Sequence, residues 1–283
     1  MNTTFEKTYT IGGDLTVNRL GYGAMRITGK GIWGPPKDKA EAIRVLQKAV
    51  ELGVDFIDTA DSYGPYVSEE LIAEALYPYK NGLVIATKGG LTRTGPDQWP
   101  INSSPEHLKE ALEGSLKRLK LEQIDLYQLH RIDPNVPFED TLEFLKKAQQ
   151  EGKIKHIGLS EVNIENIKKA QEFVEIVSVQ NMYSVDNRKW EAELLYCAEN
   201  KIAFIPWFPL NGGNEEGMKK IKVLAEKKNA TIQQIALSWL LHHSPNILLI
   251  PGTSSVAHLE ENMKTASVEL TEDDLKEMED LSA

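Results

Sequence analysis

The chain has 283 residues, a length that one large α/β domain with a single core can reach. Its 42 acidic and 32 basic residues give a formal net charge of −10, which argues against a general affinity for nucleic acid or anionic membranes. The first ten residues lack the apolar core of a signal peptide, and no apolar run approaches the roughly 20 residues that span a bilayer. We therefore expect one domain over residues 1–283, located in the cytoplasm, with small-molecule ligands.

A short hairpin is predicted first, from the segment TYTIGGDLTV with Gly12 and Gly13 at its turn. Brief apolar runs then recur along the chain, and each precedes a helical pattern. Their near-continuous hydrophobicity is typical of parallel strands that are covered on both faces. The runs are RLGYGAM, VDFIDTA, GLVIATK, QIDLYQLH, IKHIGLS, EIVSVQN, IAFIPWF and NILLIPG.

The helices between these runs have readable ends. Ser104 stands as an N-cap before Pro105, and Thr231 with Gln234 forms a capping-box pattern. Eight strand and helix units without a long linker predict a closed (β/α)₈ barrel, or TIM barrel, behind the N-terminal hairpin. An open, doubly wound sheet is the alternative.

The segment GKGIWG at residues 29–34 matches the glycine pattern of a dinucleotide-binding turn. In that turn the third glycine packs within the first turn of a helix. Here Pro35 and Pro36 follow, and the helical pattern begins only near Asp38. We interpret the segment as a flexible loop over the mouth of the barrel.

Polar residues at the ends of neighbouring strands suggest a proton-donating site. Asp58 and Tyr63 follow the second strand, Lys88 ends the third, and His130 ends the fourth. Active sites of such barrels lie at the carboxyl ends of the strands, so these side chains are expected to converge. An ammonium group from Lys88 would lower the pKa of Tyr63 toward neutrality, and Asp58 would keep that lysine charged.

His130 would orient and polarise a substrate carbonyl. Each of these residues alone is more often a structural group, and the hypothesis depends on their convergence. Asp61 is interpreted as a turn or helix-capping residue. Cys197, the only cysteine, is expected to be a small buried thiol on a helix.

With these four residues in this order, the chain resembles the aldo-keto reductase superfamily. The segments GLVIATKGG, LYQLHR, GLS and IPGTSSVAHLEEN also match family motifs in the family's order. The resemblance implies a (β/α)₈ barrel, NADPH as coenzyme, no metal, and the reversible reduction of a carbonyl to an alcohol. It also implies that Asp58, Tyr63, Lys88 and His130 are catalytic, with Tyr63 as the acid.

The resemblance further implies a set of coenzyme contacts. Ser160, Glu161 and Gln180 would hold the nicotinamide carboxamide, and the Trp207 segment would stack on its ring. The segment after the eighth strand would bind the phosphates, and Glu261 with Asn262 would face the adenine. The implied set is Ser160, Glu161, Gln180, Trp207, Phe208, Pro209, Leu210, Gly252, Thr253, Ser254, Ser255, His258, Glu261 and Asn262.

Two departures from the family pattern concern charge. Glu161 stands where asparagine is usual, which adds a negative charge near the nicotinamide. Gly252 and His258 stand where many members have lysine and arginine against the 2′-phosphate. The sequence therefore offers less positive charge to bind the 2′-phosphate, and so less reason to expect a preference for NADPH over NADH.

The combination of GYGAM, a glycine-rich loop ending in GPP, and IPWFPL resembles a branch related to bacterial pyridoxal reductase. This implies an aromatic aldehyde substrate, with Trp33, Tyr66 and Trp99 for stacking and Arg131 for an anionic oxygen. We therefore expect an NADPH-dependent reductase of aldehydes or reactive ketones, including reduction of pyridoxal to pyridoxine. The alternative is an NADPH-binding regulatory subunit on the same barrel, with incidental turnover.

Overall fold

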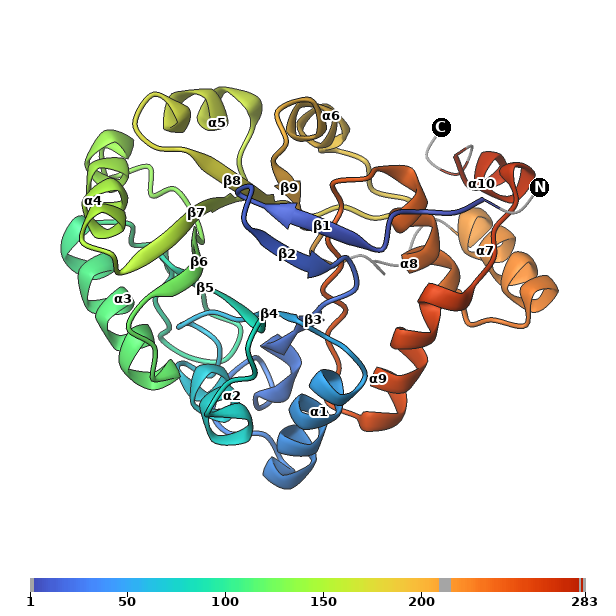
Figure 1. Cartoon of the computed structure of the whole chain (residues 1–283), viewed down its shortest axis with the longest axis horizontal. Helices are drawn as coiled ribbons and strands as arrows, with labels where there is room; N and C mark the ends of the chain where they lie inside the picture. Colours follow the sequence, from blue (N-terminus) through green and yellow to red (C-terminus); the bar gives the residue numbers. More distant parts are fainter. Residues whose placement is uncertain (1–2, 209–214, 280, 282–283) are drawn as a thin grey trace.

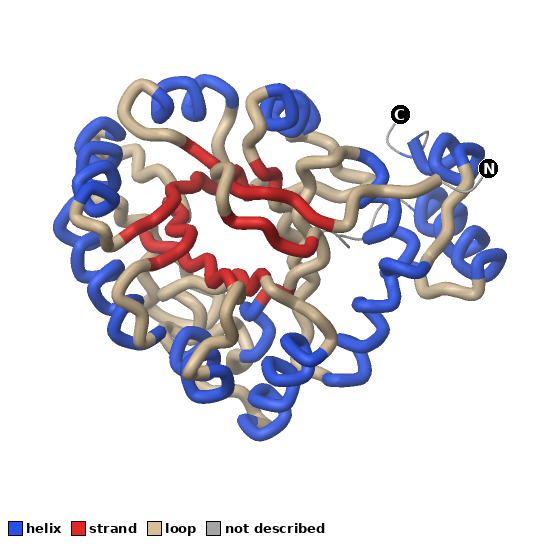
Figure 2. The backbone as a smooth tube through the Cα atoms, viewed as in Figure 1, coloured by secondary structure: helices blue, strands red, loops and turns tan. Residues whose placement is uncertain are grey.

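A parallel sheet of seven strands curls into a ring, and helices pack around its outer face (Figures 1 and 2). The computed structural model describes residues 3–208, 215–279 and 281. Neighbours in the ring follow chain order: β3 (Tyr22–Gly23), β4 (Phe56–Asp58), β5 (Val84–Gly89), β6 (Ile124–Leu129), β7 (Ile154–Ser160), β8 (Ile176–Gln180) and β9 (Ala203–Phe204). Sequential parallel strands with a helix between them are what the alternation of patterns predicts.

The ring is closed by residues 246–250, which belong to the eighth predicted run. The Leu248 amide donates to the carbonyl oxygen of Phe204 at 2.9 Å, on one side of the gap. On the other side, the amide of Leu249 donates to Arg19 O and that of Gly21 to Leu249 O, both at 2.8 Å. The predicted barrel with its N-terminal hairpin is thus confirmed.

Capping residues in the sequence define where several of the surrounding helices begin. Ser104 caps its helix as predicted, Thr231 and Gln234 form the predicted capping box, and Asp38 caps the first helix. The α-helices are α1 (Lys39–Glu51), α2 (Val67–Leu76), α3 (Pro105–Leu119), α4 (Phe138–Gln150), α5 (Ile164–Gln171), α6 (Glu191–Glu199), α7 (Glu215–Lys228), α8 (Ile232–His243), α9 (Val256–Met263) and α10 (Glu272–Glu279). Two 3₁₀ helices, η1 (Ala24–Ile27) and η2 (Lys264–Ser267), complete the described elements.

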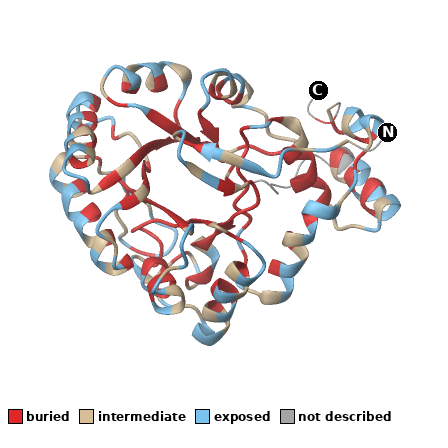
Figure 3. Cartoon of the chain, viewed as in Figure 1, coloured by how far each residue is buried: buried red, intermediate tan, exposed pale blue. Residues whose placement is uncertain are grey.

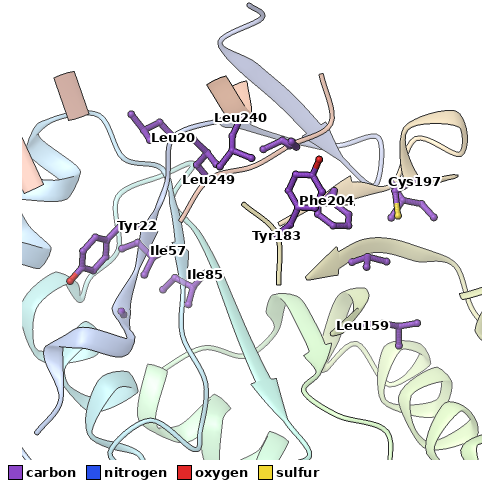
Figure 4. Packing of buried hydrophobic residues seen from close by; sticks show 14 of the residues in the cluster. Leu20, Tyr22, Ile57, Ile85, Leu159, Tyr183, Cys197, Phe204, Leu240 and Leu249 are labelled. Carbon is purple, nitrogen blue, oxygen red and sulfur yellow. The ribbon is translucent and has the colours of Figure 1, made fainter. Parts of the chain in front are cut away.

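Side chains on the strands alternate between two apolar cores. One core lies between strands and helices and contains Ile57, Ile85 and Leu159, while its helical side includes Leu240 (Figure 4). The second core contains Phe56, Val84, Ala86 and Leu126, which are the alternate residues of the same strands. Figure 3 shows the strands of the ring mostly buried and the outer faces of the helices exposed. Polar residues that continue the second set therefore enter the barrel interior.

The hairpin of β1 (Thr8–Ile11) and β2 (Leu15–Asn18) crosses the ring at its amino-terminal end. Ile11 and Val17 of the hairpin belong to the interior core. Asp14 accepts a hydrogen bond from the His156 ring at 2.6 Å and pairs with Lys155 at 3.0 Å, at the beginning of β7. The hairpin therefore closes the end of the barrel opposite to the carboxyl ends of the strands.

Cys197 lies in α6 and is buried, and burial raises the pKa of its thiol to about 12. The expected inert thiol is thus confirmed. In the part of the chain that the structure describes, none of the helices combines the length and the apolar character needed to cross a membrane.

Candidate active site

The period of the strands places polar side chains at the carboxyl end of the barrel interior. Asp58 comes two residues after the interior Phe56 on β4, and Lys88 comes two after the interior Ala86 on β5. Gln128 on β6 follows the interior Leu126 in the same way. Parallel register aligns these ends, because Asp58 pairs with Ala86 and Lys88 pairs with Gln128.

Asp58 is the centre of a buried hydrogen-bond network. Its Oδ2 accepts from Lys88 Nζ at 2.6 Å, and its Oδ1 accepts from Gln128 Nε2 at 3.1 Å and Gln180 Nε2 at 2.9 Å. Lys88 is fully buried and also donates to the carbonyl oxygen of Thr59 at 2.8 Å. Burial by itself disfavours the ammonium, but Asp58 and Tyr63 outweigh it and raise the pKa of Lys88. The predicted pairing is present.

Tyr63 lies beside this ion pair, on the loop between β4 and α2. Nζ of Lys88 is 5.2 Å from the centroid of the Tyr63 ring. Burial raises the pKa of the Tyr63 hydroxyl, and the charge of Lys88 opposes this without reversing it. The predicted net decrease in this pKa is therefore wrong, since removal from water has the larger effect. Tyr63 stays protonated at neutral pH.

His130 faces the Tyr63 ring edge-on, with the two ring centroids 5.9 Å apart. Burial lowers the pKa of His130 well below its ordinary value, and the positive charges of Lys88 and Arg131 lower it further. The imidazole is therefore neutral at physiological pH and can donate one N–H. The four residues Asp58, Tyr63, Lys88 and His130, called the tetrad below, lie together as predicted.

The tetrad borders a cavity of about 610 Å³, a volume within the usual range for small-molecule sites. Asp58, Tyr63 and His130 line the cavity, and the fully buried Lys88 lies behind them. Eight other predicted residues line it as well: Ser160, Gln180, Trp207, Phe208, Gly252, Asn262, Trp99 and Arg131. One continuous cavity thus runs from the tetrad to α9.

The predicted substrate residues divide into two groups. Trp99 and Arg131 line the cavity, and Arg131 donates to Ser160 Oγ at 3.0 Å. The half-exposed Tyr66 lies instead on the guanidinium of Arg118, 4.2 Å from its ring centroid. Trp33 forms a β-bridge with Gly64 outside the cavity wall.

Glu161 has a contact that the sequence did not suggest. Its Oε1 accepts from the Trp207 indole N–H at 2.7 Å and from the Met182 amide at 2.6 Å. The carboxylate therefore fixes the orientation of the Trp207 ring in the cavity wall. Pro209 and Leu210, two other predicted coenzyme residues, lie outside the described residues.

The far end of the cavity is lined by Gly252, which precedes α9, and by Asn262 in the last turn of α9, whereas Thr253, Ser254, Ser255, His258 and Glu261 are not lining residues. Ser255 is the N-cap of α9, and Thr253 Oγ1 accepts from the Ser255 amide at 3.1 Å. Ser254 and His258 are exposed, and the backbone oxygen of Glu261 accepts from Gln234. The predicted phosphate residues thus lie at the amino end of α9, whereas Glu261 and Asn262 lie in its last turn.

Glycines bring two loops together in the wall between these ends. A Cβ atom on Gly252 would lie 2.8 Å from the carbonyl oxygen of Gly23, so the backbones meet there without an intervening side chain. Arg26 lines the same wall, and its Cγ would be 3.5 Å from that Cβ. An exposed cation thus stands beside the position where the family often has lysine. A long anionic ligand such as a dinucleotide fits this cavity.

Several residues of the site were missed by the sequence analysis. Gln128 could have been found as a polar residue at an interior position of a strand. Nothing in the sequence pointed to Glu41, because it lies on α1, far from α9 in the chain. It accepts a hydrogen bond from the Val256 amide of α9 at 3.0 Å. Asp61 lies in a turn before α2, as interpreted, and its backbone oxygen accepts from the Tyr66 amide at 2.7 Å. Its buried Oδ1 has no hydrogen-bond partner among the described residues, and burial followed by Glu69 raises the pKa of its carboxyl well above the ordinary value.

Residues 19–283 match the model of the aldo/keto reductase family. The chain belongs to the aldo/keto reductase family. It is 52% identical to an uncharacterised oxidoreductase of Schizosaccharomyces pombe, over 92% of this chain and 85% of the relative. It is 43% identical to pyridoxine 4-dehydrogenase of Escherichia coli, over 97% of this chain and 98% of the relative.

Solved structures of aldo-keto reductases have the same fold. The thermostable aldo-keto reductase Tm1743, in complex with the inhibitor epalrestat, has a TM-score of 0.84 and 29% identity, with all of both chains covered. The holo form of AKR11C1 from Bacillus halodurans has a TM-score of 0.83 and 27% identity, over 98% of this chain and 96% of the other. As an aldo/keto reductase, the protein is an oxidoreductase whose coenzyme is NADP(H).

Proposed function

We propose that this aldo/keto reductase reduces aldehydes or reactive ketones to alcohols with NADPH, and that Tyr63 donates the proton. The observation that carries the proposal is the position of the buried tetrad at one end of a cavity that extends to α9. The nicotinamide supplies a hydride when the coenzyme is bound. The remaining chemistry is proton donation and charge stabilisation, which the side chains can provide.

The coenzyme would lie along the cavity wall that the predicted residues form. Ser160 and Gln180 would hold the nicotinamide carboxamide, and Trp207, fixed by Glu161, would cover its ring. The amides and hydroxyls of residues 253–255, with His258, would bind the phosphates at the start of α9. Glu261 and Asn262 would face the adenine, and Arg26 adds a positive charge nearby.

The tetrad residues divide the proton chemistry among them. Tyr63 is protonated and can give its proton to the substrate oxygen, which leaves a buried phenolate. Lys88, kept charged by Asp58, stabilises that phenolate. The neutral His130 can donate a hydrogen bond to the same carbonyl oxygen and so orient it toward Tyr63.

The proposed substrate is a flat aromatic aldehyde such as pyridoxal. The 43% identity to pyridoxine 4-dehydrogenase of Escherichia coli supports this class. In the cavity, Trp99 offers a ring face or edge and Arg131 a positive charge for a phenolic oxygen. Leu91 and Ile101 make the same wall apolar.

The proposal is tested by NADPH oxidation at 340 nm with a panel of aldehydes. The Tyr63→Phe variant keeps the ring and loses only the proton donor, so we expect kcat to fall about 10²- to 10⁴-fold. The dissociation constant for NADPH should not change. Tyr196→Phe is the matched control, because that hydroxyl lies on the surface of α6 and bonds only to Gln171 among the described residues.

Two results would refute parts of the proposal. A Tyr63→Phe enzyme with more than about a tenth of wild-type kcat would exclude Tyr63 as the acid. NADPH binding without oxidation in the presence of any aldehyde would favour a coenzyme-binding regulatory subunit. Among aldehydes, kcat/KM for pyridoxal should at least equal that for benzaldehyde, and pyridoxal as one of the poorest substrates would contradict the aromatic class.

A further inference from the structure

Arg93 occupies the junction of three loops at the mouth of the cavity. Its five N–H groups all donate to backbone carbonyl oxygens, which belong to three segments of the chain. The acceptors are Gly31 at 2.9 Å and Ile32 at 2.7 Å, Ser62 at 2.8 Å, and Gly95 at 3.2 Å and Gln98 at 2.8 Å. The first pair lies in the glycine-rich loop, Ser62 directly precedes Tyr63, and the last pair lies in the loop after β5.

Arg93 also stacks on the aromatic residues of these loops. Its guanidinium carbon is 3.6 Å from the centroid of the Trp99 ring and 5.6 Å from that of Trp33. In turn, the Trp99 ring meets the Tyr63 ring edge-on, with centroids 6.4 Å apart. One side chain therefore links the backbone next to Tyr63 with the ring that packs against it.

The loop after β5 is shaped like a small hairpin around Arg93. Leu91 and Ile101 form an antiparallel bridge, and Gly95 and Gln98 form a second one at the tip. Leu91, Trp99 and Ile101 from this loop all line the cavity. The loop that Arg93 holds therefore supplies an apolar wall beside Tyr63.

We propose that Arg93 is a positioning residue that holds this apolar wall, and Trp99 above all, against Tyr63, and so gives the site its preference for flat aromatic carbonyl compounds. The inference rests on the proposed function and names the element that selects its substrate. Lysine could not replace arginine here. Its ammonium has three donors at one point, whereas the five carbonyl oxygens surround a planar fork.

The test compares benzaldehyde with propanal in Arg93→Lys and Trp99→Leu variants. Trp99→Leu removes the ring and leaves Arg93 in place. We expect KM for benzaldehyde to rise about 10-fold in both variants, while KM for propanal changes less than about 3-fold. The dissociation constant for NADPH should be unchanged. Arg188→Lys is the matched control, because Arg188 also stacks on a tryptophan, 4.6 Å from the Trp239 ring, but away from the cavity.

A second measurement makes the test independent of turnover. Benzaldehyde and propanal are titrated onto the complex with NADP⁺, in which neither can be reduced, and their dissociation constants should show the same selective change. This arm decides the role of Arg93 even if the wild-type protein proves not to be a reductase.

Equal changes for the two aldehydes, or a parallel loss of NADPH affinity, would show that Arg93 is only structural and overturn the proposal. If Arg93→Lys does not fold, an unchanged aldehyde ratio in Trp99→Leu overturns it as well.

Discussion

Burial sets the protonation states of individual residues in the site, and its effect depends on the charge of each group. It lowers the pKa of His130 and raises that of Tyr63, because each side chain is charged in only one of its two forms. For Lys88 the same effect is reversed by the contact with Asp58. The result is one neutral donor, one protonated acid and one fixed positive charge in direct proximity.

The pH dependence of reduction should follow from these shifts. The pKa of His130 is below its ordinary value of about 6.5, and that of Tyr63 is above its ordinary value of about 10. Neither residue therefore changes its protonation state between these two pH values. We expect kcat/KM for an aldehyde to be flat from about pH 6.5 to about pH 9. Rate measurements across this range check it, and half-maximal activity near pH 6.5 would mean that a charged His130 is accessible.

At the level of elements, the contact between α1 and α9 bears on coenzyme selectivity. Glu41 of α1 accepts a hydrogen bond from the first amide of α9, at the helix end where a phosphate is predicted to bind. The Val256 amide, and then Arg44, lower the pKa of Glu41, so its carboxylate is charged at neutral pH. A negative charge at this end should oppose a 2′-phosphate.

Glu41→Gln should therefore strengthen NADPH binding several-fold and leave NADH binding unchanged. The glutamine oxygen can still accept from Val256, while the negative charge and the hydrogen bonds from Arg44 to Oε2 are lost. Fluorescence titration of both coenzymes measures the effect, with Glu51→Gln at the exposed end of α1 as the control. Equal changes for NADPH and NADH would place the 2′-phosphate away from Glu41.

In the whole molecule, the two ends of the barrel have separate tasks. The β1–β2 hairpin crosses the ring (Figure 1) and closes the amino-terminal end with Ile11 and Val17 in the interior core. The tetrad and the cavity lie at the carboxyl end. The strands between the two ends contribute most of the interior core. Stability and ligand binding should therefore respond to different substitutions.

Ile11→Ala should reduce the free energy of unfolding by about 2 to 5 kcal/mol, because it leaves a cavity at a fully buried position. The dissociation constant for NADPH should not change. Urea unfolding and coenzyme titration measure the two quantities, and Leu195→Ala, at an exposed position of α6, should cost less than about 0.5 kcal/mol. A matching loss of NADPH affinity would show that the hairpin and the cavity are coupled.

The sequence by itself determined the barrel and the membership of the tetrad. Apolar runs that alternate with capped helices allow few arrangements, and polar residues at successive strand ends must then meet. The Lys88–Asp58 pair followed from the cost of burying an unpaired ammonium. These inferences need only periodicity and the chemistry of single side chains.

Only the tertiary structure decided the balance of opposing effects and the contacts between distant loops. The pKa of Tyr63 depends on how much water is removed, which no local pattern measures. The five bonds of Arg93 and the contact of Glu41 with α9 join segments whose separation in space depends on the closed barrel. Tyr66 could be named as an aromatic residue near the mouth, but its direction, toward Arg118, is a property of packing.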